Sequence, residues 1–147
     1  MADTLKKEMQ EDLNEARRAG DRFARDVLST TLSEVRNREI EMGDEADDDE
    51  VRNVISKAVK QREEAARQMR DGGRPELADK EMREAELLSD YLPPPLDEEE
   101  VRSMVREIIE GGADQLGSVM GRLMPKIRGR FEGQEANRIV REELERA

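Results

Sequence analysis

Apolar residues recur every three or four positions along most of the chain, which is the period of an amphipathic α-helix. Between Met1 and the prolines at 93–95, this period is interrupted only at short polar or glycine-containing turns. Helices joined by such short turns pack antiparallel to their neighbours. The pattern therefore predicts an N-terminal bundle of four helices, in residues 3–19, 21–43, 49–71 and 75–92.

The ends of these helices carry their own signals. Asp3 and Asp21 stand where an N-cap is expected, and Gly20 stands where a left-handed residue ends a helix. The pair Gly72–Gly73 ends the third helix, and Pro75 fits the first turn of the fourth.

Three consecutive prolines, Pro93–Pro95, end the helical pattern of the first part of the chain. Proline donates no backbone hydrogen bond and restricts the preceding residue to extended conformations, so the fourth helix is expected to stop near Leu92. A run of prolines forms a semi-rigid spacer. We predict two modules, residues 1–92 and 97–147, with a Pro-rich hinge at 93–96; an ordinary connection within one bundle is the alternative.

Beyond the hinge the helices are shorter. Asp97 and Glu100 form a capping box at the start of a helix that stops at Gly111–Gly112. Pro125 is expected to break the following apolar segment into two short helices, and a last helix is predicted at about 134–145. A unit of about 50 residues is marginal alone, so it is expected to lean on the first module or on a partner.

The composition predicts an all-α fold and a cytoplasmic location. Charged residues make up 43% of the 147 residues and aromatic residues 2%, which leaves too few bulky side chains for a core built on a sheet. No apolar run is long enough for a membrane span, and the N-terminus lacks the apolar core of a signal peptide. With no cysteine for disulfides, a cytoplasmic protein is expected.

The sequence argues against an independent enzyme. It has no histidine and no cysteine, which removes the usual acid/base group near neutral pH and the strongest nucleophile. Phosphate-binding loops, dinucleotide fingerprints and zinc-ligand patterns are lacking too, so no cofactor or metal is expected, although a carboxylate-only site stays open. The acidic run 44–50 is better explained as a solvated loop at a helix N-terminus than as a cation site.

One local excess of positive charge stands out in a chain whose net charge is −11. No acidic residue lies between Asp114 and Glu132, and four basic residues fall there; we call this segment the basic island. Its cations are Arg122, Lys126, Arg128 and Arg130, and Gly121, Gly129 and Gly133 would let a partner's backbone approach. The island favours contacts with phosphates, while a solvated helix face is the alternative.

A second basic ridge follows the third helix, with Lys60, Arg67 and Arg74 seven residues apart. Acidic residues are interleaved with it, and pairing within the helix explains the ridge without a ligand. We therefore rank it below the basic island.

Two long blocks resemble the GatB/YqeY family: residues 60–96, with Glu84 before Tyr91-Leu92-Pro93, and residues 117–144, with Met124-Pro125-Lys126 before Gly129-Arg130. The family contains stand-alone YqeY-like proteins and the C-terminal tail of the B subunit of aspartyl/glutamyl-tRNA amidotransferase. In this chain Met124, Lys126, Gly129 and Asn137 match the pattern of that tail. Ser118 stands where relatives carry lysine, and Phe131 replaces a small residue.

The resemblance implies a non-catalytic accessory protein that contacts tRNA. The predicted RNA-binding residues are Lys126 and Asn137, which match the pattern of the tail, together with Arg122, Arg128 and Arg130 of the surrounding basic island. Its expected partners are tRNA and an amidotransferase or another translation protein. The family label, carbon–nitrogen ligase with glutamine as amido-N donor, has no counterpart in the chemistry of these 147 residues. The alternative is a protein-interaction module without RNA contact, in which Met104, Met120 and Met124 contact a larger enzyme. The sequence does not indicate an oligomeric state.

Overall fold

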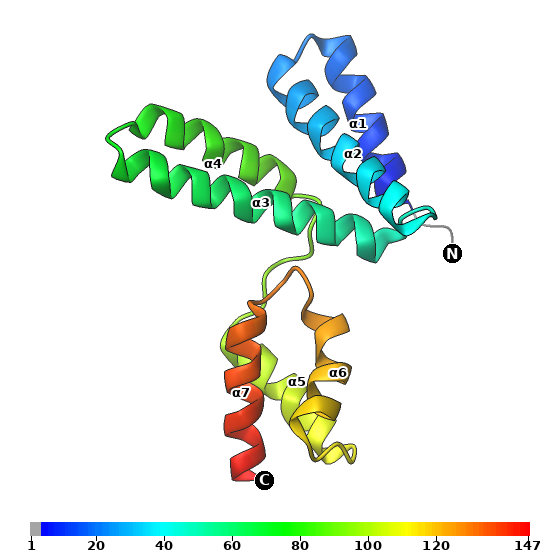
Figure 1. Ribbon diagram of the computed structural model, residues 1–147, viewed down its shortest axis with the longest axis vertical. Helices are drawn as coiled ribbons and strands as arrows, with labels where there is room; N and C mark the ends of the chain where they lie inside the picture. Colours follow the sequence, from blue (N-terminus) through cyan, green and yellow to red (C-terminus); the bar gives the residue numbers. More distant parts are fainter. Residues whose placement is uncertain (1–3) are drawn as a thin grey trace. The chain divides into compact units, whose positions relative to one another are not determined.

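In the computed structural model, residues 4–147 are described, and they form seven α-helices and no strand (Figure 1). This confirms the all-α prediction. The helices are α1 (Leu5–Ala19), α2 (Arg22–Met42), α3 (Asp48–Asp71), α4 (Pro75–Ser89), α5 (Glu98–Glu110), α6 (Leu116–Ile127) and α7 (Gly133–Arg146). Contacts within the chain fall into an N-terminal unit, Met1–Leu92, and a C-terminal unit, Pro93–Ala147, and each is described by itself below.

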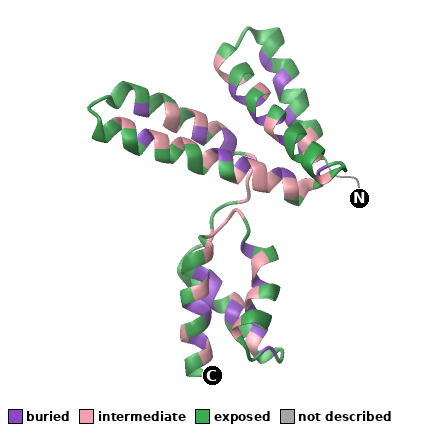
Figure 2. Cartoon of the chain, in the orientation of Figure 1, coloured by how far each residue is buried: buried purple, intermediate pink, exposed green. Residues whose placement is uncertain are grey.

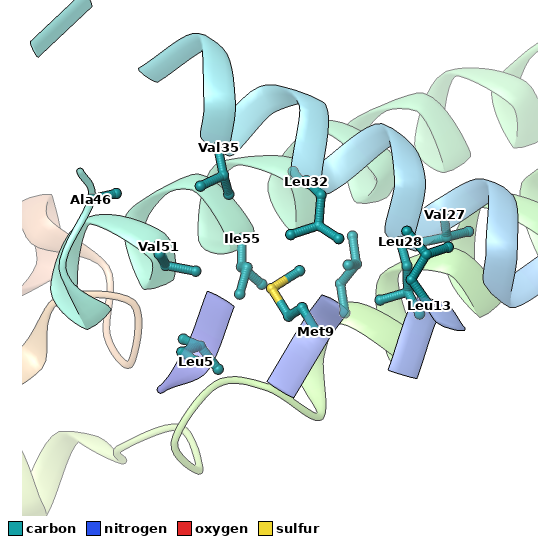
Figure 3. Packing of buried hydrophobic residues seen from close by; sticks show 12 residues of the cluster. Leu5, Met9, Leu13, Val27, Leu28, Leu32, Val35, Ala46, Val51 and Ile55 are labelled. Atoms are coloured by element: carbon teal, nitrogen blue, oxygen red, sulfur yellow. The ribbon is translucent and has the colours of Figure 1, made fainter. Parts of the chain in front are cut away.

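The N-terminal unit consists of two helical hairpins, α1–α2 and α3–α4 (Figure 1). The predicted antiparallel pairing is found within each hairpin. The shared core is built where the first half of α3 meets the α1–α2 hairpin: Met9, Leu32 and Ile55 point toward one another there (Figure 3). Burying each such side chain contributes roughly 1.5–3 kcal/mol, so this cluster holds the hairpins together.

Alanines line the rest of the α3–α4 hairpin. Ala66 and Ala78 are both fully buried yet lie outside the core cluster, and Figure 2 shows most of the surrounding helix surface exposed. Small side chains let the two helices approach closely. Arg62, which continues the apolar stripe in the sequence, is half-buried and pairs with Glu84 at 3.2 Å.

Local signals at the helix ends gave mostly correct predictions. Gly20 has φ +70° at the end of α1, and Asp21 accepts a hydrogen bond from the Ala24 amide at 3.0 Å. The predicted cap Asp3 lies outside the described residues. The first amide of α1, on Leu5, donates to Asp48 Oδ1 at 3.0 Å, so a residue of α3 caps this helix.

The prediction that α4 reaches Leu92 is wrong, because the helix ends at Ser89. The amides of Tyr91 and Leu92 instead donate to the carbonyls three residues back, at 3.1 and 3.0 Å. Leu92 precedes Pro93, whose ring disfavours the helical conformation there, and the helix tightens into a turn before it stops.

In the C-terminal unit, α5, α6 and α7 pack on a common apolar core. The capping box of Asp97 and Glu100 is confirmed, with both bonds at 2.8–2.9 Å. α7 runs from Gly133 to Arg146, one residue beyond its predicted range at each end. The fully buried side chains of this core are Val101, Val105, Val119, Leu123, Ile127, Ala136, Ile139 and Val140.

Ion pairs between α5 and α7 flank this core. Glu143 is only 4% exposed and accepts hydrogen bonds from Arg102 at 2.9 Å and Arg106 at 2.8 Å. Arg102 is also buried and makes a second bond to Glu142 at 2.7 Å. The hydrogen bond from Arg106, followed by that from Arg102, lowers the pKa of Glu143 against the opposing effect of burial.

The prediction that Pro125 breaks this segment is wrong: α6 continues through it to Ile127. Proline cannot donate to the carbonyl of Gly121, four residues earlier. Both residues are exposed, so water can satisfy that carbonyl, and the amide of Arg128 still closes the last turn by donating to Met124 at 3.0 Å. The helix lacks one backbone hydrogen bond at Pro125 but continues as a helix to Ile127.

We expect Pro125→Ala to raise the free energy of unfolding of the C-terminal unit by about 1 kcal/mol. Alanine restores the missing amide and removes the ring, and these gains exceed the greater freedom of the unfolded chain. Thermal unfolding followed by circular dichroism measures the effect. An unchanged or lower midpoint would show that the local geometry of α6 depends on the proline.

Candidate functional site

The acidic run 44–50 caps and pairs within the N-terminal unit. Asp47 is the N-cap of α3 and accepts from the Glu50 amide at 2.8 Å. Asp49 pairs with Arg52, and Glu50 pairs with Arg38. No group of three or more potential ligands capable of holding a metal is found among the described residues. The interpretation of this run as acids at a helix N-terminus is confirmed.

A groove of about 510 Å³ lies between α2 and α3. Arg38 spans its lining by pairing with Glu41 on α2 and Glu50 on α3, both at 3.2 Å. Hydrogen bonds from Glu50 and then Glu41 raise the pKa of Arg38. Arg38, Glu41 and Glu50 are thus engaged with one another in this groove, while Glu34 and Lys57 add one charge of each sign to its lining.

The basic ridge on α3 is partly paired as well. Arg67 forms an ion pair with Glu64 at 2.8 Å, one turn away on the same helix. This is the kind of pairing within the helix that the sequence suggests for the ridge.

The basic island begins on α6 and continues into the turn that follows it. Arg122 and Lys126 are one turn apart on α6, and both are exposed. Arg128 is the exposed C-cap residue. Gly129 adopts φ +75°, a conformation that favours glycine, and so reverses the chain after the helix. The apolar face of α6 is buried in the unit's own core, which leaves these cations toward solvent.

Three cations of the island differ from the other basic residues of the C-terminal unit. Within residues 93–147, all of which the structure describes, Arg122, Lys126 and Arg128 make no side-chain hydrogen bond or ion pair. The remaining cations all have partners. Arg102, Arg106, Arg138 and Arg146 pair with glutamates, Arg141 donates to Asn137, and Arg130 donates to a backbone carbonyl.

Arg130 has a structural role that the sequence does not reveal. Its Nε donates to the Pro94 carbonyl at 3.1 Å, and its own carbonyl accepts from the Leu96 amide at 2.9 Å. These two bonds attach the predicted hinge segment to the turn after α6. Because its side chain is half-buried and engaged, Arg130 is less available to a ligand than the other three cations.

Two glycines on α6 leave part of the helix surface at the basic island without side chains. Gly117 and Gly121 are exposed, lie one turn apart and have helical backbone conformations without positive φ. Apart from the adjacent residues and the nearby backbone of the same helix, a methyl group added at either position would meet no atom within 4 Å. Each interior glycine destabilises a helix by about 1 kcal/mol relative to alanine, and nothing in the fold requires it here.

The two other predicted site positions lie on α7. A methyl group at Gly133 would lie 3.9 Å from Cε of Met124 on α6, so the start of α7 packs beside the island's helix. Asn137, one turn later, is half-buried, and its Oδ1 accepts a hydrogen bond from Arg141 at 2.8 Å.

The methionines predicted to contact a partner protein pack mainly against the core of their own unit. Met104, Met120 and Met124 are partly buried and pack against the C-terminal core, and so does Phe131. Ser118 donates to the Gln115 carbonyl at 2.9 Å in the first turn of α6. Phe131 is therefore a core side chain rather than an exposed stacking surface.

The unpaired cations lie beside exposed glycines of α6, and this arrangement is suited to binding an extended anion such as a phosphodiester backbone. Arginine and lysine neutralise phosphates, and small residues let a phosphodiester backbone come close to the helix. Phe131 is half-buried and packs against the core, which reduces the ring surface that a base could stack on. The arrangement thus favours phosphate contacts over reading of bases.

Comparison with known proteins supports the resemblance found in the sequence. The YqeY-like protein family matches residues 6–144. The chain is 28% identical over 127 residues to altered inheritance of mitochondria protein 41, mitochondrial, of Pyrenophora tritici-repentis, covering 83% of this chain and 70% of that protein. The protein of the same name from Clavispora lusitaniae is 29% identical over 119 residues, with 79% and 69% covered.

Among the described residues, no helix is long and apolar enough to cross a membrane. The family match extends over α1–α6 and nearly all of α7, so it includes the helices that hold the basic island. The chain belongs to the YqeY-like protein family.

Proposed function

We propose that the C-terminal unit binds the phosphate backbone of tRNA, with Arg122, Lys126 and Arg128 as the principal contacts. The observation behind this proposal is that these three cations, alone among the basic residues of a fully described unit, make no internal pair. Leaving side chains unpaired beside abundant glutamates makes them available to an external anion. On this proposal the protein is a non-catalytic accessory of a tRNA-dependent process, as the GatB/YqeY kinship suggests.

Asn137 and Arg130 are expected to contribute less to binding than Arg122, Lys126 and Arg128. Asn137 can still donate through its amide nitrogen while its oxygen accepts from Arg141. Arg130 is expected to position the turn that holds Arg128, since its bonds to Pro94 and Leu96 fix that turn. A cytoplasmic location stays a prediction from the sequence; the names of the two fungal relatives call those proteins mitochondrial.

The test is the binding of labelled bulk tRNA to the full chain at several salt concentrations. We expect Arg122→Ala/Lys126→Ala to weaken binding about tenfold and to reduce the slope of log affinity against log salt by about 2, since two phosphates are no longer neutralised. The matched control is Lys7→Ala/Arg17→Ala, which removes the same charge from exposed positions on α1. Equal losses in both double variants would contradict the proposed site.

A second variant tests the interface without changing charge. Gly121→Leu places a bulky side chain in open space beside Arg122, so the fold is expected to persist. If a phosphodiester backbone lies against this face, binding weakens about tenfold while the salt slope stays the same. Gly121→Ala, with one methyl group, is expected to stabilise α6 and to weaken binding less. Unchanged affinity in Gly121→Leu would move the contact away from α6.

A further inference from the structure

A second groove, of about 400 Å³, lies on the N-terminal unit, far along the sequence from the basic island. It is formed by α1, the start of α2 and the end of α4. Its apolar lining comes from all three helices, so its shape depends on how the α1–α2 hairpin meets α4. These apolar residues are Ala16, Ala19, Ala24, Leu28 and Leu87.

The other residues that line this groove are acidic, apart from Tyr91. They are Glu8, Asp12, Glu15, Asp21 and Asp90, and no lysine or arginine is among the lining residues. We call this feature the acidic groove. An apolar floor under an acidic border differs from the α2–α3 groove, whose lining contains both acidic and basic residues.

Two of the carboxylates that line the groove have no side-chain partner among the described residues. Glu15 pairs with Arg18 at 2.8 Å, and Asp21 caps α2. Glu8 and Asp90, by contrast, make no side-chain hydrogen bond or ion pair with any described residue. Glu8 lies on α1 and Asp90 is the C-cap residue of α4, so these two sides of the groove each contribute a negative charge without such a partner.

Tyr91 marks where these charges converge. Its hydroxyl donates to Asp12 Oδ2. Burial is the largest cause that raises the pKa of this hydroxyl, followed by its hydrogen bond to Asp12 and by the charges of Asp12, Glu8 and Asp90. Three carboxylates therefore act on one end of the groove, above a partly buried aromatic ring.

The length of the groove indicates the size of its occupant. The residues of α1 that line it run from Glu8 to Ala19, which at 1.5 Å per residue is about 17 Å. A helix of about three turns has this length. Amphipathic helices bind such grooves with apolar residues at helical spacing, while their charged residues lie along the borders.

We infer that the acidic groove binds a basic amphipathic helix of about three turns supplied by another protein. Charge complementarity selects this occupant: lysine or arginine pairs with Glu8 and Asp90, and small apolar residues cover the alanine floor. The same negative border repels nucleic acid. The chain's own basic helix, α6, cannot serve, because Val119, Leu123 and Ile127 on its apolar face are buried in the C-terminal core. The inference is independent of tRNA binding.

The experiment uses the full chain and a fluorescein-labelled, amidated peptide of about 14 residues, long enough for more than three helical turns. The peptide contains leucine and alanine on one face and lysine along both edges. A scrambled peptide of the same composition, which lacks the apolar stripe, measures charge attraction alone. Fluorescence polarisation at low and moderate salt is expected to show at least about tenfold tighter binding of the amphipathic peptide.

Two double variants locate the binding. Glu8→Gln/Asp90→Asn removes the unpaired border charges, and Glu11→Gln/Glu86→Gln removes the same net charge from exposed positions on the same two helices. We expect the first to weaken binding about fivefold and the second to change it by less than about twofold. Ala19→Trp, which fills the groove without changing charge, is expected to weaken binding about tenfold.

Several results would overturn the inference. Equal binding of both peptides, or equal losses in both double variants, would leave only bulk attraction to an acidic protein. Absence of peptide binding at low salt would show that the acidic groove does not bind such a helix. Self-association of the chain in sedimentation experiments, abolished by Glu8→Gln/Asp90→Asn, would make a second copy the occupant.

Discussion

Replacing Leu123 with alanine is expected to unfold the C-terminal unit under conditions in which the unchanged protein is folded. Leu123 is fully buried among side chains of α5, α6 and α7. A buried leucine-to-alanine change costs about 2–5 kcal/mol through lost burial and the cavity left behind. A unit of 55 residues has a small core, and its net stability is expected to be about 3–5 kcal/mol. The cost therefore equals most or all of the stability.

The same variant tests whether the two units are separate domains joined by residues 93–96, as the sequence predicts. We expect amide signals of α5–α7 to collapse in nitrogen–proton correlation spectra while those of α1–α4 keep their positions. Ile40→Ala serves as the control, because Ile40 is 72% exposed and its truncation leaves no cavity. Loss of the α1–α4 signals in Leu123→Ala would contradict independent folding.

The sequence predicts helices well in this chain because their determinants are local. The αL glycine at Gly20, the N-cap Asp21 and the capping box of Asp97 and Glu100 each act within one helical turn. Apolar residues at helical spacing then define the buried faces. A chain with 2% aromatic residues and few β-branched runs offers no competing strand pattern.

Two of the features that the sequence misses depend on residues far apart in the chain. The cap of Leu5 by Asp48 joins residues 43 positions apart, and the bond of Arg130 to the Pro94 carbonyl joins residues 36 positions apart. The continuation of α6 through Pro125 depends on solvent reaching the Gly121 carbonyl. Periodicity and propensity contain no information of this kind.

The basic island illustrates the same limit at the level of function. The sequence identifies four cations in a segment without acids, but it cannot tell which of them are engaged by the fold. The structure separates Arg130, bound to Pro94, from Arg122 and Lys126, which have no partner in their fully described unit. For the acidic groove a signal does exist, because Glu8, Asp12 and Glu15 follow helical spacing along α1. Only the packing of α4 beside them reveals the apolar floor.

The ion pairs between α5 and α7 lead to a prediction about acid stability. Glu143 is buried with its two oxygens bonded to Arg102 and Arg106, and its pKa is lowered in the folded chain. In the unfolded chain a glutamate titrates near its ordinary value, about 4.3. A folded-state pKa below the unfolded one adds stability that is fully present above about pH 5. That stability is lost as the pH falls through the folded value.

We expect Glu143→Gln to lower the free energy of unfolding of the C-terminal unit by about 3 kcal/mol at pH 7, the lower end of the cost of removing one partner from a buried ion pair. Arg102 keeps Glu142 as a partner, which limits the loss. Glutamine does not titrate, so the difference between the variant and the unchanged protein should shrink steadily below about pH 4.5. Urea unfolding of the full chain, followed by signals of α5–α7 between pH 3 and pH 7, measures both effects.

The control for this prediction is Glu145→Gln, two residues along the same helix. Glu145 is exposed and makes no side-chain hydrogen bond or ion pair with a described residue, so its replacement should leave the pH dependence of α5–α7 unchanged. If Glu143→Gln and Glu145→Gln gave parallel curves, general charge repulsion in a chain of net charge −11 would explain the acid response. A difference confined to Glu143→Gln, present at pH 7 and smaller at acidic pH, would assign the response to the buried carboxylate that joins α5 to α7.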